Sequence, residues 1–299
     1  MSRFCITGAA GFVGAEVCRQ ALARGHSIIG LDQRPVSSDM NYAFHVADVT
    51  DRESMARIVR ECDGIIHCAA VVGPAPASAD PVMATQVNVL GTLSVLEAAR
   101  GANLRVVNLS TATLYGRIEK AGPLDESDPV NPVGIYDATK MMSETLCDAY
   151  RKSFSVSVAS FRTGFVYGPR HSTGDYFVGR LMQGETVIQD AGRDHPCDFT
   201  YVKDLALGLV QAAECGNLPE SIYNLSGGVL RTRGELAAIV MKHFPHAQIA
   251  LSPGVDPARH LRGANVIARA RRDFGYAPQY DLEAGIADWI AEARGAGAA

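Results

Sequence analysis

Residues 7–14 read Thr7-Gly8-Ala9-Ala10-Gly11-Phe12-Val13-Gly14, with three glycines between an apolar run and a helical stretch. The first glycine lets the chain turn tightly, the second lets the backbone approach a diphosphate, and the third lets a helix pack closely on a sheet. The first turn of such a helix presents unpaired N–H groups to an anion. The stretch therefore predicts a strand, a turn and a helix that together bind the diphosphate of a dinucleotide.

An acidic residue follows the next expected strand, at the position where it can bind the ribose of a dinucleotide. Asp32 follows the next apolar run, Ser27–Leu31, close to the ~20-residue spacing of dinucleotide-binding folds. A carboxylate there accepts from a ribose 2′-hydroxyl and repels a 2′-phosphate, which favours NAD over NADP. Arg34 is near enough to meet a phosphate, but Pro35 and the surrounding loop favour a solvated arginine. The sequence therefore predicts NAD as the cofactor.

Short apolar runs alternate with amphipathic stretches through the first half of the chain. The expected strands are Phe4–Thr7, Ser27–Leu31, Ala43–Val46, Gly64–Cys68 and Arg105–Leu109, and the expected helices are 12–24, 51–60, 81–100 and 137–152. This alternation predicts βαβ units in a Rossmann-like α/β fold with a doubly wound parallel sheet.

The pattern is less regular after about residue 165. Strand-like pieces recur at 156–161 and 221–225, and helical spacing recurs at 203–214, 234–243 and 282–293. We therefore expect an NAD-binding domain over 1–164, with further sheet elements from about 200–225. Residues 165–299 are expected to form mainly a smaller substrate-binding lobe that is interleaved with the sheet.

Composition excludes several classes of protein. The 299 residues carry a formal net charge of −4, which argues against binding to nucleic acid or to an anionic membrane. The seven cysteines are scattered and show neither zinc spacing nor a disulfide framework, so we expect thiols in a reducing compartment and no metal site. No secretory signal and no apolar run of membrane-spanning length is evident. A cytoplasmic protein is the expectation.

Two further strand ends could contact a dinucleotide. Asp48 and Val49 follow the third expected strand, where the carboxylate either accepts from an adenine amino group or caps the helix that begins near Asp51. Ala69 and Ala70 follow the fourth strand, and such small residues let a dinucleotide lie against the strand edge. The neighbouring His67 is interpreted as a core histidine.

A second group of residues has the chemistry for proton transfer. Thr111 ends an apolar run, and Tyr136 and Lys140 stand four residues apart where a helix begins, so that they share one face. A phenol has an ordinary pKa of ~10, and a nearby ammonium and a positive nicotinamide would both lower it. Thr111 would then hydrogen-bond the substrate oxygen. A Tyr-xxx-Lys string alone is weak evidence, because it occurs on many ordinary helices.

Together these pieces resemble the extended short-chain dehydrogenase/reductase family, in its NAD-dependent sugar epimerase/dehydratase branch. The matching elements keep the family's order from residue 3 to about 275 and are Thr7-Gly8-xx-Gly11-Phe12-x-Gly14, Asp32, Asp48-Val49, His67-Cys68-Ala69-Ala70, Asn88-Val89-x-Gly91-Thr92, Ser110-Thr111-Ala112-Thr113-Leu114-Tyr115-Gly116, Tyr136-xxx-Lys140, Arg162-xxx-Val166-Tyr167-Gly168-Pro169 and Asp198-Phe199-x-Tyr201-Val202-x-Asp204.

The resemblance implies an enzyme that passes a hydride between a substrate carbon and nicotinamide C4. Its implied catalytic residues are Thr111, Tyr136 and Lys140, with Asn88 as a chiefly structural fourth member and Val166 beside the nicotinamide. It also implies a homodimer that pairs the helices 81–100 and 137–152.

Departures from the family pattern bear on the substrate. Ala112 and Thr113 occupy the places where 4,6-dehydratases of the family carry Asp and Glu, so that activity is not expected. Phe165 stands where nucleotide-sugar members have Asn, and Cys197 stands where they often have an arginine that clamps the diphosphate. A cysteine cannot replace a bidentate cation. We therefore expect a smaller, carbohydrate-like substrate without a nucleotide.

The expected substrate-binding residues are Thr111, Ala112, Phe165, Arg170, His171, Arg193 and Cys197. His195, Arg259 and Arg262 could also supply positive charge to a carboxylate or phosphate, although each of these cations alone is more often a surface residue.

Three functions stay open on the sequence. The first is an NAD-dependent dehydrogenase of a sugar, sugar acid or polyol. The second is a nucleotide-sugar epimerase, such as a UDP-sugar 4-epimerase, that oxidises and re-reduces one carbon without net NADH. The third is a dinucleotide-sensing protein without turnover, which is disfavoured because such relatives usually lose the Tyr or the Lys that this chain retains.

Overall fold

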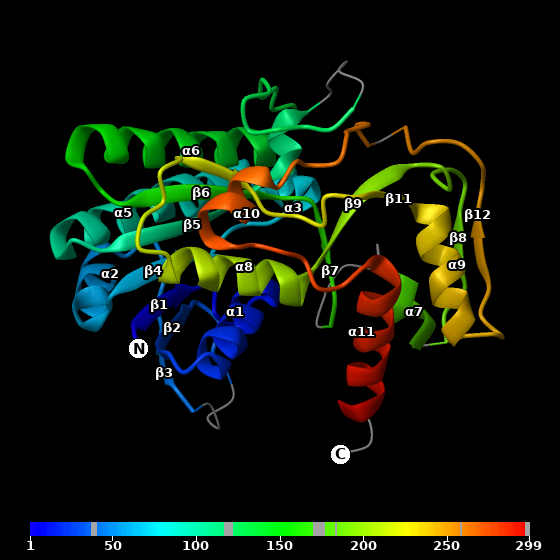
Figure 1. Cartoon of the computed structure of the whole chain (residues 1–299), viewed down its shortest axis with the longest axis horizontal. Helices are drawn as coiled ribbons and strands as arrows, with labels where there is room; N and C mark the ends of the chain where they lie inside the picture. Colours follow the sequence, from blue (N-terminus) through cyan, green and yellow to red (C-terminus); the bar gives the residue numbers. More distant parts are fainter. Residues whose placement is uncertain (37–40, 117–121, 170–176, 183, 258, 297–299) are drawn as a thin grey trace.

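A seven-stranded parallel sheet forms the centre of the protein (Figure 1). The computed structural model describes residues 1–36, 41–116, 122–169, 177–182, 184–257 and 259–296. The strand order is β10-β6-β5-β4-β1-β2-β3, and every pairing in this sheet is parallel. The strands are β1 (Arg3–Thr7), β2 (Ser27–Asp32), β3 (Ala43–Val46), β4 (Gly64–His67), β5 (Arg105–Thr111), β6 (Val158–Thr163) and β10 (Ile222–Asn224). The order reverses between β1 and β4, where ligands bind in doubly wound folds.

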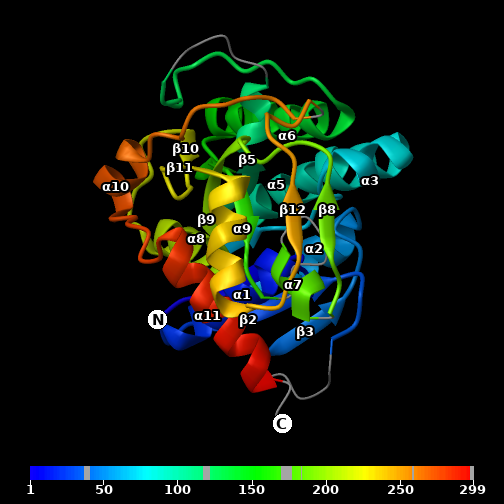
Figure 2. The same ribbon diagram turned by 90° about the vertical axis from the view of Figure 1, so that its right-hand side faces the viewer.

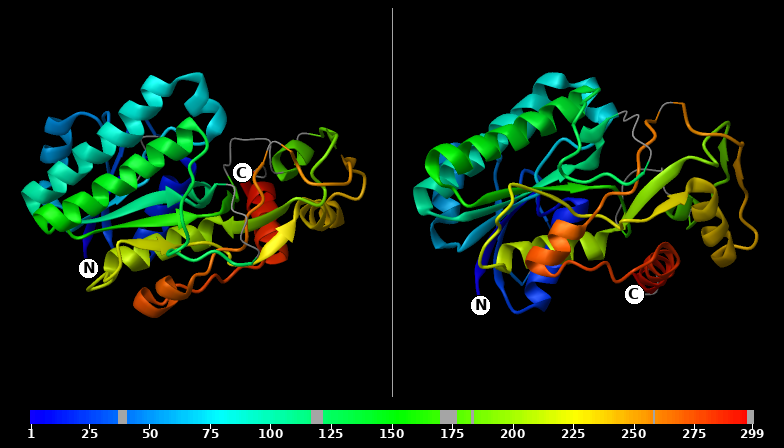
Figure 3. Two further views of the ribbon diagram at one scale, coloured as in Figure 1. Left: turned by 90° about the horizontal axis from the view of Figure 1, so that it is seen from above. Right: turned by 45° about the horizontal axis from the view of Figure 1, so that its top comes forward.

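Helices cover both faces of this sheet, because its strand residues alternate between two apolar cores (Figure 3). Phe4 and Ile6 of β1 face one core and Cys5 faces the other. The first core is closed by α1 (Phe12–Ala23), α8 (Val202–Glu214) and α10 (Ala268–Phe274). The second is closed by α2 (Arg52–Ile58), the 3₁₀ turn η1 (Val59–Glu61), α5 (Gly91–Ala102) and α6 (Ile135–Phe154). These layers confirm the Rossmann-like fold.

A smaller lobe with its own core adjoins the sheet (Figure 2). Its strands are β7 (Phe165–Tyr167), β9 (Pro196–Tyr201) and β11 (Leu230–Thr232), which form one sheet, and β8 (Val187–Gln189) and β12 (Ile249–Leu251), which form another. Its helices are α7 (Phe177–Met182), α9 (Arg233–His243) and α11 (Leu282–Ala296). The C-terminal half does not stay in this lobe, since α8 and α10 pack in the core of the large sheet and β10 is its edge strand.

One long helical segment combines three elements. The helix α4 (Pro81–Thr85) leads into a π turn, η2 (Gln86–Leu90), which continues directly into α5. The short helix α3 (Pro74–Ala79) ends just before this segment. Among the described residues, Pro81–Ala102 is the only helix long and apolar enough to cross a membrane by length and composition alone. Half of that apolar window is buried inside the protein, as in a core helix, so this is weak evidence for a membrane.

Candidate active site

The glycine loop forms a cradle at the carboxyl ends of β1 and β4. Gly8 has a φ of +71°, and a Cβ added there would lie 2.7 Å from the backbone nitrogen of Ala69. A Cβ at Gly14 would collide with the carbonyl oxygen of Gly8, so α1 packs against the turn as closely as the sequence predicts. Helix α1 begins at Phe12 and Gly11 is its N-cap. The cradle therefore fits a diphosphate at the helix N-terminus.

Asp32 ends β2 beside this cradle. Its carboxylate accepts from the amide of Ala10 at 3.1 Å and from the amide of Arg34 at 3.0 Å. The Arg34 Nε atom lies 3.4 Å from the same carboxylate, and the Arg34 side chain is 63% exposed. A carboxylate offers about four lone-pair positions, so capacity for a ribose hydroxyl remains. Arg34 is therefore exposed but not free in solvent, since it pairs with Asp32 and its Nη2 atom lies 3.7 Å from where a Cβ on Gly11 would be.

The two open interpretations of Asp48 can now be separated in part. Asp51 caps α2, since its side chain accepts from the amides of Glu53 and Ser54. Asp48 is exposed and accepts from the amide and the hydroxyl of Thr50 at 2.8 and 2.7 Å. The capping interpretation of Asp48 is therefore wrong, and the adenine contact stays a prediction.

Other residues expected at the cofactor differ in how far their side chains are exposed. The Val49 side chain is buried in the core, 2.7 Å from where a Cβ on Gly91 would lie, so only its backbone could meet a dinucleotide. The Ala69 amide donates to Thr7, and Ala70 and Val13 are partly exposed beside the glycine cradle. Val166 lies in β7, where the small lobe meets the large sheet.

Thr111, Tyr136 and Lys140 converge on the end of β5. Thr111 is the last residue of β5, and Tyr136 and Lys140 lie in the first two turns of α6. All three are buried, and the Thr111 side chain acts to lower the pKa of the Tyr136 hydroxyl. The Lys140 ammonium donates to the carbonyl of Leu109 at 2.6 Å. The fold thus brings together the three residues that the sequence predicts to be catalytic.

The electrostatics of this group differ from the prediction in one respect. Burial raises the pKa of Tyr136 to about 12, with the Thr111 hydrogen bond acting in the opposite direction and the Asp137 charge adding to the rise. Burial also lowers the pKa of Lys140. Lys140 bonds to the β5 backbone and is not among the described groups that shift the pKa of Tyr136. Without NAD, burial is thus the largest influence on the pKa of Tyr136, and the lowering expected beside a positive nicotinamide stays a prediction.

Asn88 and His67 are held in buried polar contacts. The Asn88 side chain accepts from the Val71 amide at 2.8 Å and donates to the Val71 carbonyl and to the Thr139 hydroxyl. Both His67 nitrogens bond to threonine hydroxyls, and burial lowers the pKa of His67 to about 3. His67 is thus a neutral core histidine, and Asn88 ties the chain after β4 to α6.

A buried ion pair lies directly behind the catalytic group. The Arg162 guanidinium on β6 donates to both carboxylate oxygens of Glu144 on α6. The Nη2–Oε2 distance is 2.7 Å and the Nε–Oε1 distance is 3.0 Å. The Ser110 hydroxyl on β5 donates to the same carboxylate at 2.6 Å. The Glu144 charge also acts to raise the pKa of Lys140. The pair thus joins β5, β6 and α6 beneath the candidate site.

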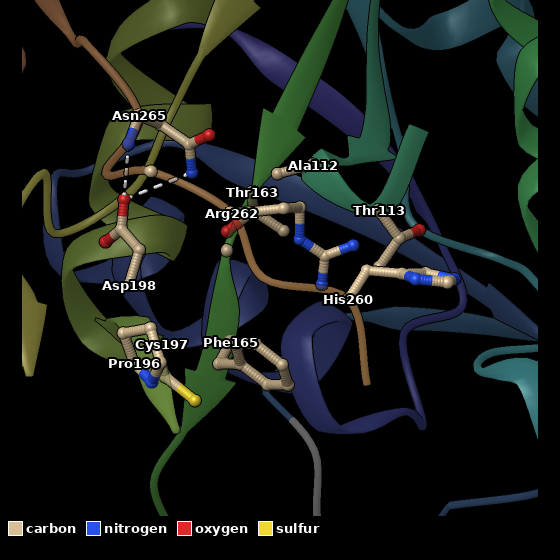
Figure 4. Close-up of a pocket in the computed structure, with 12 residues that line it drawn as sticks. Ala112, Thr113, Thr163, Phe165, Pro196, Cys197, Asp198, His260, Arg262 and Asn265 are labelled. Atoms are coloured by element: carbon tan, nitrogen blue, oxygen red, sulfur yellow. Dashed lines mark hydrogen bonds between the residues drawn. The ribbon is translucent and has the colours of Figure 1, made fainter. Parts of the chain in front are cut away.

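A pocket with a cavity volume of about 40 Å³, open on one side to solvent, is lined by residues that begin one position past Thr111 (Figure 4). Its wall includes three of the expected substrate-binding residues, Ala112, Phe165 and Cys197. The other lining residues are Thr113, Thr163, Gly164, Pro196, Asp198, His260, Arg262, Gly263 and Asn265. The pocket therefore lies between the end of the large sheet and the segment that follows β12.

Arg262 is the main cation of this pocket. Figure 4 shows its guanidinium pointing toward Thr113 and His260. It lies 6.0 Å from the Phe165 ring centre, and the Arg259 guanidinium lies 5.5 Å from the same ring. Within the described residues Arg262 makes neither a hydrogen bond nor an ion pair, and its partial burial lowers its pKa. An anionic group could therefore enter the pocket and pair with it.

Not every expected substrate residue reaches the pocket. Arg193 is exposed and pairs with Asp194 at 3.1 Å, and His195 is fully buried. Neither of them lines the pocket, and nor does Thr111. Arg170 and His171 lie outside the described residues. Sequence reasoning did not find His260, which stands in a basic run from Arg259 to Arg262 that could have signalled it.

Asp198 anchors the segment that carries the pocket's cation. Its carboxylate accepts from the Ser226 hydroxyl at 2.8 Å, from the Gly228 amide at 3.0 Å, and from the amide and side chain of Asn265 at 2.9 and 3.1 Å. Burial raises the pKa of Asp198 to about 6. Because Asn265 lies three residues past Arg262, this cluster anchors the backbone of the segment that carries the arginine.

Comparison with known proteins assigns the family. A sequence model described as the NAD dependent epimerase/dehydratase family matches residues 4–226. The chain belongs to this family. UDP-glucose 4-epimerase from Mycolicibacterium smegmatis is 29% identical over 308 residues, which cover 96% of this chain and 97% of that protein. UDP-glucuronic acid decarboxylase 2 from Arabidopsis thaliana is 28% identical over 95% of this chain, which spans 66% of the decarboxylase.

Solved structures agree with this family. The UDP-glucose 4-epimerase from Thermus thermophilus, in complex with NAD, superposes with a TM-score of 0.87 at 28% identity and covers 98% of this chain and 99% of its own. As a member of the NAD dependent epimerase/dehydratase family, this protein is an NAD-dependent enzyme of the extended short-chain dehydrogenase/reductase type, which confirms the resemblance. The glycine cradle and Asp32 are the features that fit NAD.

Proposed function

We propose that this chain is a dehydrogenase that oxidises a hydroxyl-bearing carbon of a small anionic carbohydrate, such as a sugar acid. The observation that carries the proposal is Arg262, a cation without a hydrogen-bonding or ionic partner among the described residues, inside a pocket that starts beside Thr111. Cys197, in the same wall, stands where nucleotide-sugar members often have an arginine that clamps the diphosphate. The charge of Arg262 therefore suits a single carboxylate or phosphate.

Three residues would then carry the chemistry. Bound NAD supplies the nicotinamide carbon that accepts the hydride. Tyr136 would exchange a proton with the substrate hydroxyl, because its side chain acts on the same site as Thr111, the residue directly before the pocket residue Ala112. Thr111 would hydrogen-bond the substrate oxygen, and Lys140, fixed by Leu109, would place its charge beside the nicotinamide ribose. These roles follow from the position of the three side chains at the end of β5.

The variant Arg262→Met tests the substrate class. It should raise KM for a sugar acid about 10- to 100-fold, because a hydrogen bond to a charged group contributes roughly 1.5–3 kcal/mol. KM for an uncharged polyol should change little, and kcat should fall less than KM rises. NADH formation over a panel of sugar acids and polyols measures both constants.

Arg193→Met is the matched control, since Arg193 is an exposed arginine outside the pocket. It should leave both constants unchanged. Equal losses for charged and uncharged substrates in Arg262→Met, or no NADH from any sugar acid with the unaltered enzyme, would contradict the proposed substrate class.

A nucleotide-sugar epimerase is the second candidate. It is favoured by the 29% identity to a UDP-glucose 4-epimerase over nearly the whole of both chains. Arg259 or Arg262 would then bind the phosphates in place of the missing arginine. Isomerisation of UDP-glucose without net NADH would support this candidate, and turnover of a sugar acid with stoichiometric NADH would support the first.

We also propose a homodimer formed through the long helical segment and α6. Val82 is 67% exposed, Leu90 50% and Met142 50%, although all three are large apolar residues on these two helices. Pairing the same face of two copies would bury this surface around a two-fold axis. Leu90→Asp should convert the dimer to a monomer in sedimentation at low concentration. Val229→Asp, an exposed apolar position on the smaller lobe, should leave the dimer intact, and a monomeric unaltered protein would refute the proposal.

The proposed location is the cytoplasm. All seven cysteines are thiols in the structure, two of them only partly buried, which suits a reducing compartment.

A further inference from the structure

A buried line of polar side chains connects the glycine cradle to α6, the helix of the catalytic group. The Thr7 hydroxyl at the end of β1 bonds to Nδ1 of His67 at 2.7 Å, and Nε2 of His67 bonds to the Thr92 hydroxyl of α5 at 3.2 Å. The Thr92 hydroxyl lies 2.9 Å from the Ser143 hydroxyl of α6. All four side chains are buried. Three hydrogen bonds of this polar line therefore cross from the first strand to the catalytic helix.

The sheet places the first two members of the polar line side by side. Thr7 and His67 are register partners at the ends of the parallel strands β1 and β4. Cys5 and Ile65, two residues earlier on each strand, belong to the core that α5 and α6 close, and side chains alternate along a strand. Apolar side chains could fill this layer, whereas a buried polar network fixes one arrangement of the elements that carry it.

One carbonyl sets the hydrogen-bond directions in the polar line. The Thr92 hydroxyl donates its proton to the carbonyl of Asn88 at 2.7 Å, so its oxygen can only accept and Nε2 of His67 carries a proton. Burial lowers the pKa of His67 to about 3, so the ring is neutral and Nδ1 accepts from Thr7. The Thr7 oxygen accepts in turn from the Ala69 amide at 3.3 Å. The line thus has one consistent set of donors and acceptors.

The first end of the polar line lies in the wall of the cofactor cradle. Thr7 directly precedes Gly8, and the backbone nitrogen of Ala69 lies 2.7 Å from where a Cβ on Gly8 would be. The amide that donates to Thr7 is therefore packed against the turn that fits a diphosphate. A diphosphate held by this turn acts on Ala69, and through Ala69 on Thr7.

The second end of the polar line reaches the catalytic helix at two points. Ser143 lies three residues after Lys140 on α6, so the two side chains share a face of the helix. Asn88, whose carbonyl accepts from Thr92, also donates through its side chain to the Thr139 hydroxyl at 2.9 Å. Thr139 is the residue directly before Lys140. The hydroxyl of Thr92 therefore connects to both residues that flank the lysine on α6.

We propose that His67 and Thr92 are positioning residues that couple the cofactor cradle to the catalytic helix. A diphosphate in the cradle fixes Thr7, and the bonds of His67 and Thr92 pass this constraint to α6, which holds Tyr136 and Lys140 in place. Neither positioning residue touches the substrate or the reacting atoms. The inference goes beyond the proposed function, because a dehydrogenase and an epimerase need the same alignment.

ADP tests the coupling without any substrate. It carries the diphosphate that fits the cradle and lacks the nicotinamide ribose predicted to meet Lys140. At saturating ADP, amide hydrogen exchange over residues 138–144 should slow about fivefold or more, relative to amides of α9 in the smaller lobe. The comparison with α9 corrects for the general stabilisation that any bound ligand gives. In Thr92→Val, which removes the hydroxyl and keeps the side-chain shape, this slowing should disappear although ADP still binds.

The kinetic signature should be a loss in kcat rather than in KM. Thr92→Val should lower kcat about 3- to 10-fold, as expected when one neutral hydrogen bond is lost, and should change the substrate KM less than twofold. Thr92→Ser keeps the hydroxyl and should retain both kcat and the ADP effect. His67→Leu interrupts the polar line at its centre and should reproduce the result of Thr92→Val. A merely structural role would lower Tm in these variants and leave the ADP effect intact.

Ser94→Ala is the matched control on the same helix. Ser94 is buried two residues past Thr92, and its hydroxyl has no hydrogen-bonding partner within the part of the chain that the structure describes. Its loss should leave kcat and the ADP effect unchanged. Slowing by ADP that persists in Thr92→Val, or an equal loss in Ser94→Ala, would overturn the coupling. If no sugar acid yields NADH, the proposed function fails, and the exchange rates with ADP still decide the role of the polar line.

Discussion

Tyr136→Phe should lower kcat roughly 10²–10⁴-fold, the range expected when a general acid–base group is removed. The variant deletes one hydroxyl at the end of β5 and retains the ring that packs with Ala77 and Ala84. NAD binding should persist, because the glycine cradle and Asp32 are separate from Tyr136 in the structure. Steady-state NADH production measures the loss, and a thermal shift with NAD verifies that the cofactor still binds.

The pH dependence of the unaltered enzyme follows from the same group. Burial raises the pKa of Tyr136 to about 12 in the protein alone, so the phenol is protonated at neutral pH. Oxidation of an alcohol needs the phenolate, and its rate should therefore rise with pH toward the pKa that Tyr136 has in the NAD complex. Reduction needs the phenol, and its rate should fall over the same range.

Tyr150→Phe is the matched control on the same helix. The Tyr150 hydroxyl bonds to Glu97 at 2.7 Å, far from the pocket. Its loss should cost about 1 kcal/mol of stability and leave kcat unchanged. If Tyr136→Phe retained full activity, the catalytic assignment would fail, and a dinucleotide-sensing role would become the better account of the fold.

The sequence predicts the cofactor end of the site well because its geometry is local. Gly8 and Gly14 belong to one short strand–turn–helix unit, and a Cβ at either would collide with backbone. The spacing of Tyr136 and Lys140 is likewise a property of one helix. Motifs of this kind can be read directly, since neighbours in sequence are also neighbours in space.

The substrate pocket could not be predicted in the same way. Arg262 shares the pocket with Phe165 and Thr113, and the bond from Asn265 to Asp198 joins its segment to strand β9, 67 residues earlier in the chain. Nothing near Arg262 in sequence distinguishes it from Arg193, which turned out to be exposed. The hydrogen bond from the Thr113 hydroxyl to Asp137 could not be predicted from the sequence either, because Thr113 follows β5 whereas Asp137 lies on α6.

Glu144→Leu should destabilise the protein by about 3–5 kcal/mol, the loss typical when one partner of a buried ion pair is removed. The Glu144 and Arg162 side chains are only 7% and 4% exposed, so the arginine would stay buried without its counter-ion. The Ser110 hydroxyl would also lose its acceptor on β5, one residue before Thr111. Urea unfolding with an unchanged m-value measures the difference.

The double variant Glu144→Leu/Arg162→Met distinguishes two contributions to the free energy of unfolding: the loss caused by an unpaired buried charge and the stabilisation that the ion pair itself provides. Apolar side chains of similar volume often replace a buried pair with little loss, so the double variant should be more stable than Glu144→Leu alone. Its activity should still be low, because the Glu144 charge that helps to keep Lys140 protonated is gone. Stability that recovers without activity would show that the pair serves the ammonium beside Tyr136. A double variant as unstable as the single one would instead mean that packing at these positions, and not charge, is what Glu144 supplies.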